Sequence, residues 1–134
     1  MRCYIESSIL AAALLERDPD AIQSLRDCTD PVTSALTLAE VRRAILRARI
    51  SGRLSAAAER AILHELATFE NGCAIVAVSA EVLKRAATPF PIEPIRTLDA
   101  IHLATAEMLG SEVVILSRDQ RVRANAKMLG YVLG

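Results

Sequence analysis

Four acidic side chains fall where predicted strands end or predicted helices begin. Glu6 follows a strand predicted over residues 2–5, and Asp119 comes just after a later apolar strand. Glu40 and Asp99 lie in the first turns of two predicted helices. In a parallel sheet covered by helices, functional groups gather at the carboxyl ends of the strands. The sequence therefore predicts that all four carboxylates lie along one edge of a sheet.

Converging carboxylates favour one kind of chemistry. They repel one another unless a cation lies between them. Mg²⁺ or Mn²⁺ is the type of ion that a few carboxylates, waters and a substrate phosphate hold. Such an ion polarises a phosphoryl oxygen and lowers the pKa of a water that attacks in line. The pattern therefore predicts metal-assisted cleavage of a phosphodiester, with one carboxylate as general base.

Each acid also has a purely structural explanation. Thr37 and Glu40 have the spacing of a capping box, in which the Glu reaches back to the Thr backbone. Asp99 in a first turn complements the helix dipole, and Asp119 is a suitable N-cap. Glu6 could be a surface residue at a strand end. Only the presence of all four acids at one predicted edge of the sheet favours a metal site over these structural explanations.

Strand patterns and helix patterns alternate along the chain, and most of the strand runs are continuously apolar. This is typical of a parallel sheet with helices on both faces. We expect one domain over residues 1–134, a three-layer α/β/α sandwich with a central, mainly parallel sheet of four to five strands. The predicted strands are 2–5, 31–36, 73–78, 112–116 and 131–133, and the predicted helices are 8–16, 19–28, 37–50, 55–69, 80–87, 97–109 and 117–129.

Composition narrows the class of protein further. The 134 residues are 52% hydrophobic and 3% aromatic, so the core must be built from Ala, Leu, Ile and Val. The formal net charge is zero, which excludes a strong overall field that attracts nucleic acid. The three cysteines are widely spaced and match neither a disulfide framework nor a zinc site. No apolar run has the length of a membrane span, and a cytoplasmic protein with no membrane partner is expected.

Several stretches resemble a known family. The sequence is similar to the PIN domains, and within them to the VapC-type toxin ribonucleases of bacterial toxin–antitoxin pairs. The resemblance covers essentially the whole chain in order. It rests on CYIESSIL (3–10), SALTLAEVRRA (34–44), RTLDAIHLATA (96–106), VILSRDQRV (114–122) and the terminal LGYV.

The resemblance implies a single PIN domain with the activity of a Mg²⁺- or Mn²⁺-dependent endoribonuclease. The family's metal-binding and catalytic acids carry over to Glu6, Glu40, Asp99 and Asp119, and Ser117 takes the place of the hydroxyl that supports them. The resemblance also implies a homodimer, an RNA substrate, and inhibition by a cognate antitoxin whose C-terminal segment covers the site.

Other polar residues near the predicted edge have less certain assignments. Ser7 is a further supporting hydroxyl, and Arg43, Arg96 and Arg118 are candidate contacts for the RNA backbone. For Arg118 an ion pair with a neighbouring acid is an equal alternative. For His102, three residues after Asp99, packing within the helix is favoured over a catalytic role.

Glu6 departs from the family, which usually has Asp at this position in a pattern like YLDSS. The carboxylate lies one methylene further from the backbone, and Mg²⁺ demands near-ideal octahedral geometry. Three explanations remain open. Glu6 still binds the metal, or activity is weakened with a preference for Mn²⁺, or Glu6 is an inactivating change. The first is favoured because every other acid is present.

Functions from other classes make different demands. A PIN domain with a disabled site would still bind its antitoxin or RNA, and Glu6 is the residue that discriminates this alternative. A phospho-acceptor receiver domain needs paired acids after the first strand, where only Glu6 stands. A nucleotide-binding Rossmann domain needs a glycine-rich turn there, and residues 6–11 contain no glycine.

Overall fold

A five-stranded sheet lies at the centre of the computed structural model, which describes residues 1–134. Its strand order is β3-β2-β1-β4-β5, and every neighbouring pair is parallel. The elements are β1 (Arg2–Ile5), α1 (Ser7–Leu14), α2 (Pro19–Asp27), β2 (Asp30–Ser34), α3 (Ala35–Ile50), α4 (Ala56–Asn71), β3 (Ala74–Val76), α5 (Ala80–Ala86), α6 (Thr97–Met108), β4 (Val114–Leu116), α7 (Gln120–Met128) and β5 (Val132–Leu133).

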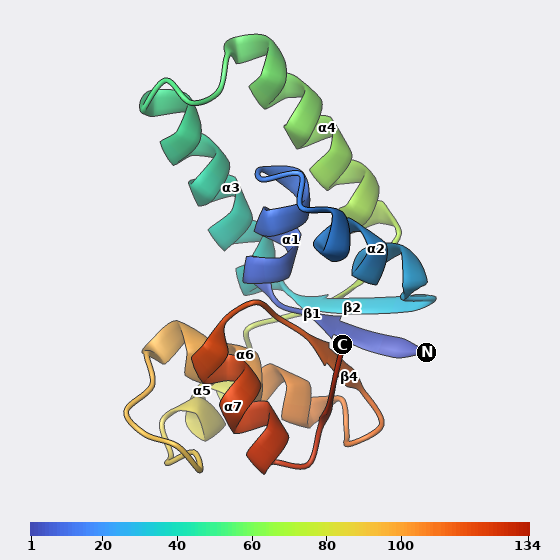
Figure 1. Cartoon of the computed structure of the whole chain (residues 1–134). Coiled ribbons are helices and arrows are strands. Elements are labelled where there is room, and N and C mark those ends of the chain that lie inside the picture. The colour runs from blue at the N-terminus through green and yellow to red at the C-terminus, as the bar shows by residue number, and fades with distance from the viewer.

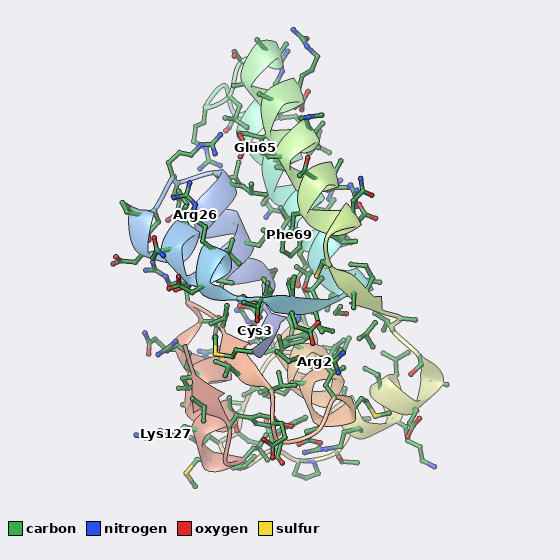
Figure 2. All side chains as sticks on the ribbon, turned by 90° about the vertical axis from the view of Figure 1, so that its right-hand side faces the viewer. Arg2, Cys3, Arg26, Glu65, Phe69 and Lys127 are labelled. Carbon is green, nitrogen blue, oxygen red and sulfur yellow. The ribbon has the colours of Figure 1, made fainter.

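Helices cover both faces of the sheet. In Figure 1, α1 to α4 lie above it, with α3 and α4 projecting as a helical pair, and α5 to α7 lie below it. Figure 2 shows the same layers from the side, with Phe69 in the upper layer, Cys3 at the sheet and Lys127 in the lower layer. The predicted α/β/α sandwich with a central parallel sheet is therefore confirmed. No helix combines the length and the apolar character that crossing a membrane requires.

The central strand β1 is buried on both faces. Cys3 and Ile5 pack into the apolar core beneath α1 to α4, and Tyr4 between them packs into the second core with α6 and α7. The side chains alternate because successive residues of a strand point to opposite faces. As a result, Tyr4 directs its hydroxyl toward α6, and the residue that follows β1 lies at the carboxyl edge of the sheet.

Every helix starts within three residues of its predicted position, and the difference at α3 bears on the site. α3 begins at Ala35, because the Ser34 hydroxyl at the end of β2 accepts a hydrogen bond from Leu36 N at 3.1 Å and acts as the N-cap. The predicted capping box of Thr37 and Glu40 is therefore wrong, and Glu40 lies in the second turn. At α6 the N-cap is Arg96 rather than Thr97, without a side-chain capping bond.

The proline-rich loop before α6 is fixed to α7 by one buried side chain. Asn125 is fully buried. Its Oδ1 accepts a hydrogen bond from Ile92 N at 2.8 Å, and its Nδ2 donates to Ile92 O at 3.0 Å. The same amide group donates to Arg121 O at 3.2 Å. Asn125 thus holds the loop that leads into Arg96 and the start of α6.

We expect Asn125→Ala to lower the free energy of unfolding by about 2 kcal/mol, because it removes these bonds and leaves backbone groups without partners. Urea denaturation measures the change. Asn71→Ala, at the exposed end of α4, is the matched control and should change stability by less than about 0.5 kcal/mol. Equal unfolding midpoints for both variants would contradict this account of the loop.

Candidate metal centre

Glu6 leaves β1 at the carboxyl edge of the sheet and becomes the N-cap of α1. Its backbone N–H donates to Leu116 O of β4 at 3.0 Å, which fixes it beside the end of that strand. The side chain turns back toward α1, where Oε2 accepts hydrogen bonds from Ser8 N at 3.1 Å and from the Ser8 hydroxyl. The expectation of a surface residue is wrong, since Glu6 is 3% exposed.

Two further hydroxyls surround the Glu6 carboxylate. Ser7 Oγ donates to Oε1 at 2.7 Å, and Ser117 Oγ, after β4, donates to Oε2 at 2.8 Å. A carboxylate has about four lone-pair sites on its two oxygens. Oε2 is therefore engaged by two serines, whereas Oε1 accepts one hydrogen bond and keeps a lone pair for another partner.

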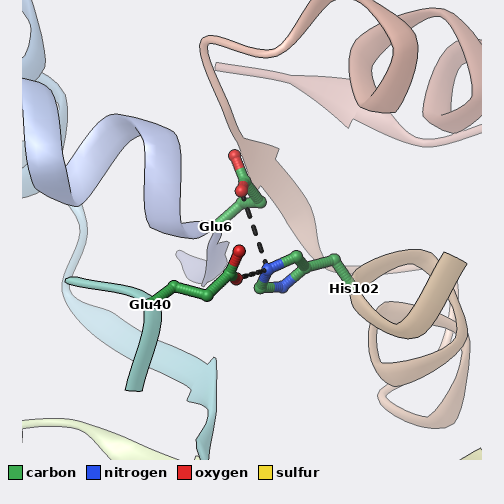
Figure 3. Close-up of side chains that lie close together, drawn as sticks. All are labelled: Glu6, Glu40 and His102. Carbon is green, nitrogen blue, oxygen red and sulfur yellow. Dashed lines mark hydrogen bonds and ion pairs between the residues drawn. The ribbon is translucent and has the colours of Figure 1, made fainter. Parts of the chain in front are cut away.

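Glu40 reaches the same place from α3, and the two glutamates meet at His102 of α6 (Figure 3). His102 Nε2 lies 2.5 Å from Glu40 Oε1 and 3.7 Å from Glu6 Oε1. One ligand atom from each of the three residues can be chosen so that all lie within 4.8 Å of one another. This is a compact group of ligand atoms on three different elements.

Asp99 and Asp119 form a second pair, bridged by Arg96. The guanidinium lies 3.2 Å from Asp99 Oδ2 and 3.4 Å from Asp119 Oδ2. Asp99 projects from the first turn of α6. Asp119 is the N-cap of α7, and its Oδ1 accepts from Arg121 N and Val122 N at 2.9 and 3.1 Å. Its predicted capping role is therefore present, and it uses only one of the two carboxylate oxygens.

The two pairs belong to one electrostatic unit. Burial raises the pKa of Asp99, the hydrogen bond from Arg96 opposes this, and the negative charges of Asp119 and Glu6 raise the pKa further. The hydrogen bond to Asp99 raises the pKa of Arg96, helped by the charges of Asp119 and Glu40. Glu6 thus acts on Asp99 and Glu40 acts on Arg96, and burial among these acids makes ionising Asp99 unfavourable.

Solvent reaches the site mainly through one acid of each pair. The side chains of Glu40 and Asp119 are 26% and 23% exposed, against 5% for Glu6 and 8% for Asp99. Glu40 also lines a hollow between α1 and α3, together with Ser7, Ser8 and Arg47. A substrate on the surface would therefore approach Glu40 and Asp119, with the other two carboxylates behind them.

The donor set fits a hard divalent cation. It consists of carboxylate oxygens from four separate segments with a few hydroxyls between them, which is the chemistry that Mg²⁺ and Mn²⁺ prefer. Burial is the main cause of the raised pKa of Asp99, and the negative charges of Asp119 and Glu6 add to it. A cation bound beside Asp99 would favour its ionised form.

The arginines named from the sequence have different surroundings. Arg96 is beside both aspartates and is 68% exposed at its side chain, so it can also contact a ligand. Arg43 is exposed on α3 and makes no ion pair. The side chain of Arg118 pairs with Asp18 of the loop before α2, which is the alternative considered for it. Its backbone N–H donates to Ser8 Oγ at 2.8 Å.

His102 and Tyr4 are the residues of this site that the sequence reasoning missed. A signal for His102 was present, because residues three apart on a helix lie on the same face, and Asp99 precedes it by three. His102 is 1% exposed and contacts Glu40 rather than serving only to pack α6. Nothing in the sequence around Tyr4 indicates more than a place in a strand.

The chain is similar to known proteins over almost its whole length. The family model described as the PIN domain matches residues 3–128. A relative from Mycobacterium tuberculosis, Ribonuclease VapC46, is 41% identical over 133 residues, which cover 97% of this chain and 94% of that protein.

Two solved structures share the fold at lower identity. The crystal structure of Mycobacterium tuberculosis VapC20, described as a Sarcin-Ricin loop cleaving toxin, superposes with a TM-score of 0.71 at 18% identity, covering 97% of this chain and 96% of that one. A toxin–antitoxin complex from Klebsiella pneumoniae has a chain that superposes with a TM-score of 0.69 at 20% identity, covering 98% and 96%.

Proposed function

Because the chain belongs to the PIN-domain family and to its VapC branch, we propose that it is a metal-dependent endoribonuclease that acts as the toxin of a toxin–antitoxin pair. One observation carries this proposal. Glu6 and Glu40 meet at His102 beside the carboxyl edge of the sheet. The charge of Glu6 also helps to raise the pKa of Asp99, which Arg96 joins to Asp119.

Glu6, Glu40, Asp99 and Asp119 would hold Mg²⁺ or Mn²⁺. When bound, the ion supplies a Lewis acid for a phosphoryl oxygen and lowers the pKa of a water. The protein contributes the geometry. Serines 7, 8 and 117 hold the Glu6 carboxylate, and the α7 N-terminus holds one oxygen of Asp119. Such second-layer contacts orient ligands and tune the affinity for the metal.

Glu40 and Asp119 are suited to the steps that involve substrate. They are the more exposed acids of the site, so either can accept a proton from the attacking water as general base. Arg96 is exposed beside Asp119 and can bind a phosphate oxygen of the RNA backbone with its guanidinium. Arg43, on the α3 surface, is the further candidate for a backbone contact.

The partner that we infer is an antitoxin protein. VapC46 is related along nearly its full length, and a similar solved chain belongs to a toxin–antitoxin complex. The hollow beside Glu40 continues between α1 and α3, where Arg47 and Arg53 line it together with Leu15 and Leu54. This mixture of cationic and apolar residues suits a peptide segment with acidic and apolar side chains. A homodimer is also part of the proposal.

Cleavage of a mixed RNA pool tests the proposal. The protein should cut RNA with Mg²⁺ or Mn²⁺ and lose all activity with excess chelator, and fresh metal should restore it. Asp27→Asn, an exposed acid of α2, is the control and should cut at the normal rate. Cleavage that is unchanged by chelator, or absent with either ion in folded protein, would contradict the proposal.

A further inference from the structure

We propose that His102, held by Tyr4, is a positioning residue that fixes Glu40 as a metal ligand. The inference rests on the proposed function, because it assigns a role within the same metal site. It concerns a buried chain of polar groups that runs from β1 through α6 to α3 and that the four acids alone do not require.

In the hydrogen bond between His102 and Glu40, only His102 can be the donor. A carboxylate accepts hydrogen bonds and offers none, so the hydrogen between them belongs to Nε2 of His102. This holds for the neutral and for the charged imidazole. At 2.5 Å from Glu40 Oε1 and 3.7 Å from Glu6 Oε1, Nε2 places its N–H between two negative groups. The imidazole thus separates the glutamates and orients one of them.

Tyr4 holds the imidazole from the other side. Its hydroxyl lies 2.7 Å from His102 Nδ1, and both residues are 1% exposed. A tyrosine hydroxyl carries a hydrogen near neutral pH, so it donates this hydrogen to Nδ1. With both ring nitrogens engaged, the ring has one orientation, and the rings of Tyr4 and His102 pack edge to face.

The two carboxylate oxygens of Glu40 therefore have different roles. Oε1 receives the hydrogen bond from His102, and Oε2 makes no hydrogen bond to the protein. A long Glu side chain on a helix surface is otherwise free to rotate, and fixing it before the metal arrives lowers the entropy lost on binding. His102 therefore prepares Oε2 of Glu40 as a ligand.

Direct binding of the metal by His102 is the alternative role, and it leads to a different expected result. If its Nε2 were itself a metal ligand, the nitrogen would have to give up its hydrogen and its bond to Glu40. Replacement by an amide donor at the same place would then not restore metal binding. Gln and Asn separate the roles, because the Gln amide nitrogen reaches the position of Nε2, and the Asn amide nitrogen reaches only that of Nδ1.

The first test needs no metal. In protein labelled with ¹⁵N-histidine and kept with chelator, NMR should show His102 with a hydrogen fixed on Nε2. The exposed His64 of α4 should show averaged signals and serves as the internal control. Glu40→Ala should shift the His102 Nε2 signal and leave His64 unchanged. A His102 that averages like His64 overturns the proposal.

The second test measures Mn²⁺ affinity by calorimetry. His102→Asn and Tyr4→Phe should weaken Mn²⁺ binding by about 10- to 100-fold, the usual effect of removing a contact behind a metal ligand. His102→Gln should stay within about fivefold of the unaltered protein. His64→Gln is the control and should bind normally. Thermal unfolding shows that each variant is folded.

The outcomes separate this inference from the proposed function. Unaltered protein that binds no Mn²⁺ and cuts no RNA overturns both. Unaltered protein that does both, with a folded His102→Asn variant of equal Mn²⁺ affinity, overturns the positioning role alone. A folded His102→Gln variant as weak as His102→Asn also overturns it, in favour of direct ligation by the imidazole.

Discussion

An Asp99→Ala protein is expected to fold and to cut RNA at about a thousandth of the normal rate or less. Asp99 is the more buried of the two aspartates in the site and projects from the first turn of α6 beside Arg96. Losing this ligand removes the metal chemistry, which contributes several kcal/mol to stabilising the transition state. A gel-based cleavage assay with Mg²⁺ and Mn²⁺ measures the rate, and Asp27→Asn is the control. A folded Asp99→Ala protein with normal activity would contradict the proposed metal site.

Replacing Asp99 by Asn should make the folded protein more stable when no metal is bound. Burial raises the pKa of Asp99, so the folded protein holds this proton to a higher pH than the unfolded chain does. Stability therefore falls as pH rises from the ordinary Asp pKa of 3.8 through the raised pKa. Asp99→Asn removes the penalty, and its Tm in chelator should exceed that of the unaltered protein more at pH 7 than at pH 4. A lower Tm at pH 7 would contradict this sign.

Glu6→Ala is expected to damage both stability and metal binding. The change removes the N-cap of α1 and the acceptor for the Ser7 and Ser117 hydroxyls, which are buried. Loss of a cap typically costs about 1 kcal/mol, and unsatisfied buried donors add about 1–3 kcal/mol. Urea unfolding in chelator should therefore show a loss of about 2–3 kcal/mol, with no measurable Mn²⁺ binding by calorimetry.

Glu6→Asp separates the two roles of this residue. Asp is a favoured N-cap, so stability should stay within about 0.5 kcal/mol of the normal value. The account predicts that this variant and the unaltered protein both bind metal and both cut RNA, because Glu6 Oε1 accepts only one hydrogen bond and keeps a lone pair for the ion. If only Glu6→Asp binds and cuts, the unaltered chain is a disabled nuclease whose remaining role is to bind its partner.

The sequence was a good guide to the layers because they depend on local patterns. Continuous apolar runs predicted the parallel sheet, and the strand after residue 30 and the final short strand lie where the pattern indicated. The boundaries were less accurate where a polar side chain decides them. Ser34 lies in β2, as predicted, and it also caps α3. The helix therefore starts two residues earlier than predicted, and Glu40 lies in its second turn instead of its first.

The four acids could be named from the sequence as a prediction, but the contacts that connect them to other residues could not. Strand ends and helix starts are local features, so Glu6, Glu40, Asp99 and Asp119 could be named from the sequence. The hydrogen bonds of His102 reach Tyr4, 98 residues away, and Glu40, 62 residues away. No local pattern encodes such contacts, since they depend on how α3, α6 and β1 pack. The bridge from Arg96 to Asp119, across 23 residues, was missed for the same reason.

Calorimetric titration of Mg²⁺ and Mn²⁺ into the unaltered protein and into Asp99→Asn tests the central claim most directly. The account predicts saturable heat for the unaltered protein with at least Mn²⁺, and none for Asp99→Asn, although both are folded. Equal binding by the two proteins would show that the ion lies elsewhere. No binding by the folded, unaltered protein would contradict the claim that these carboxylates form a metal centre.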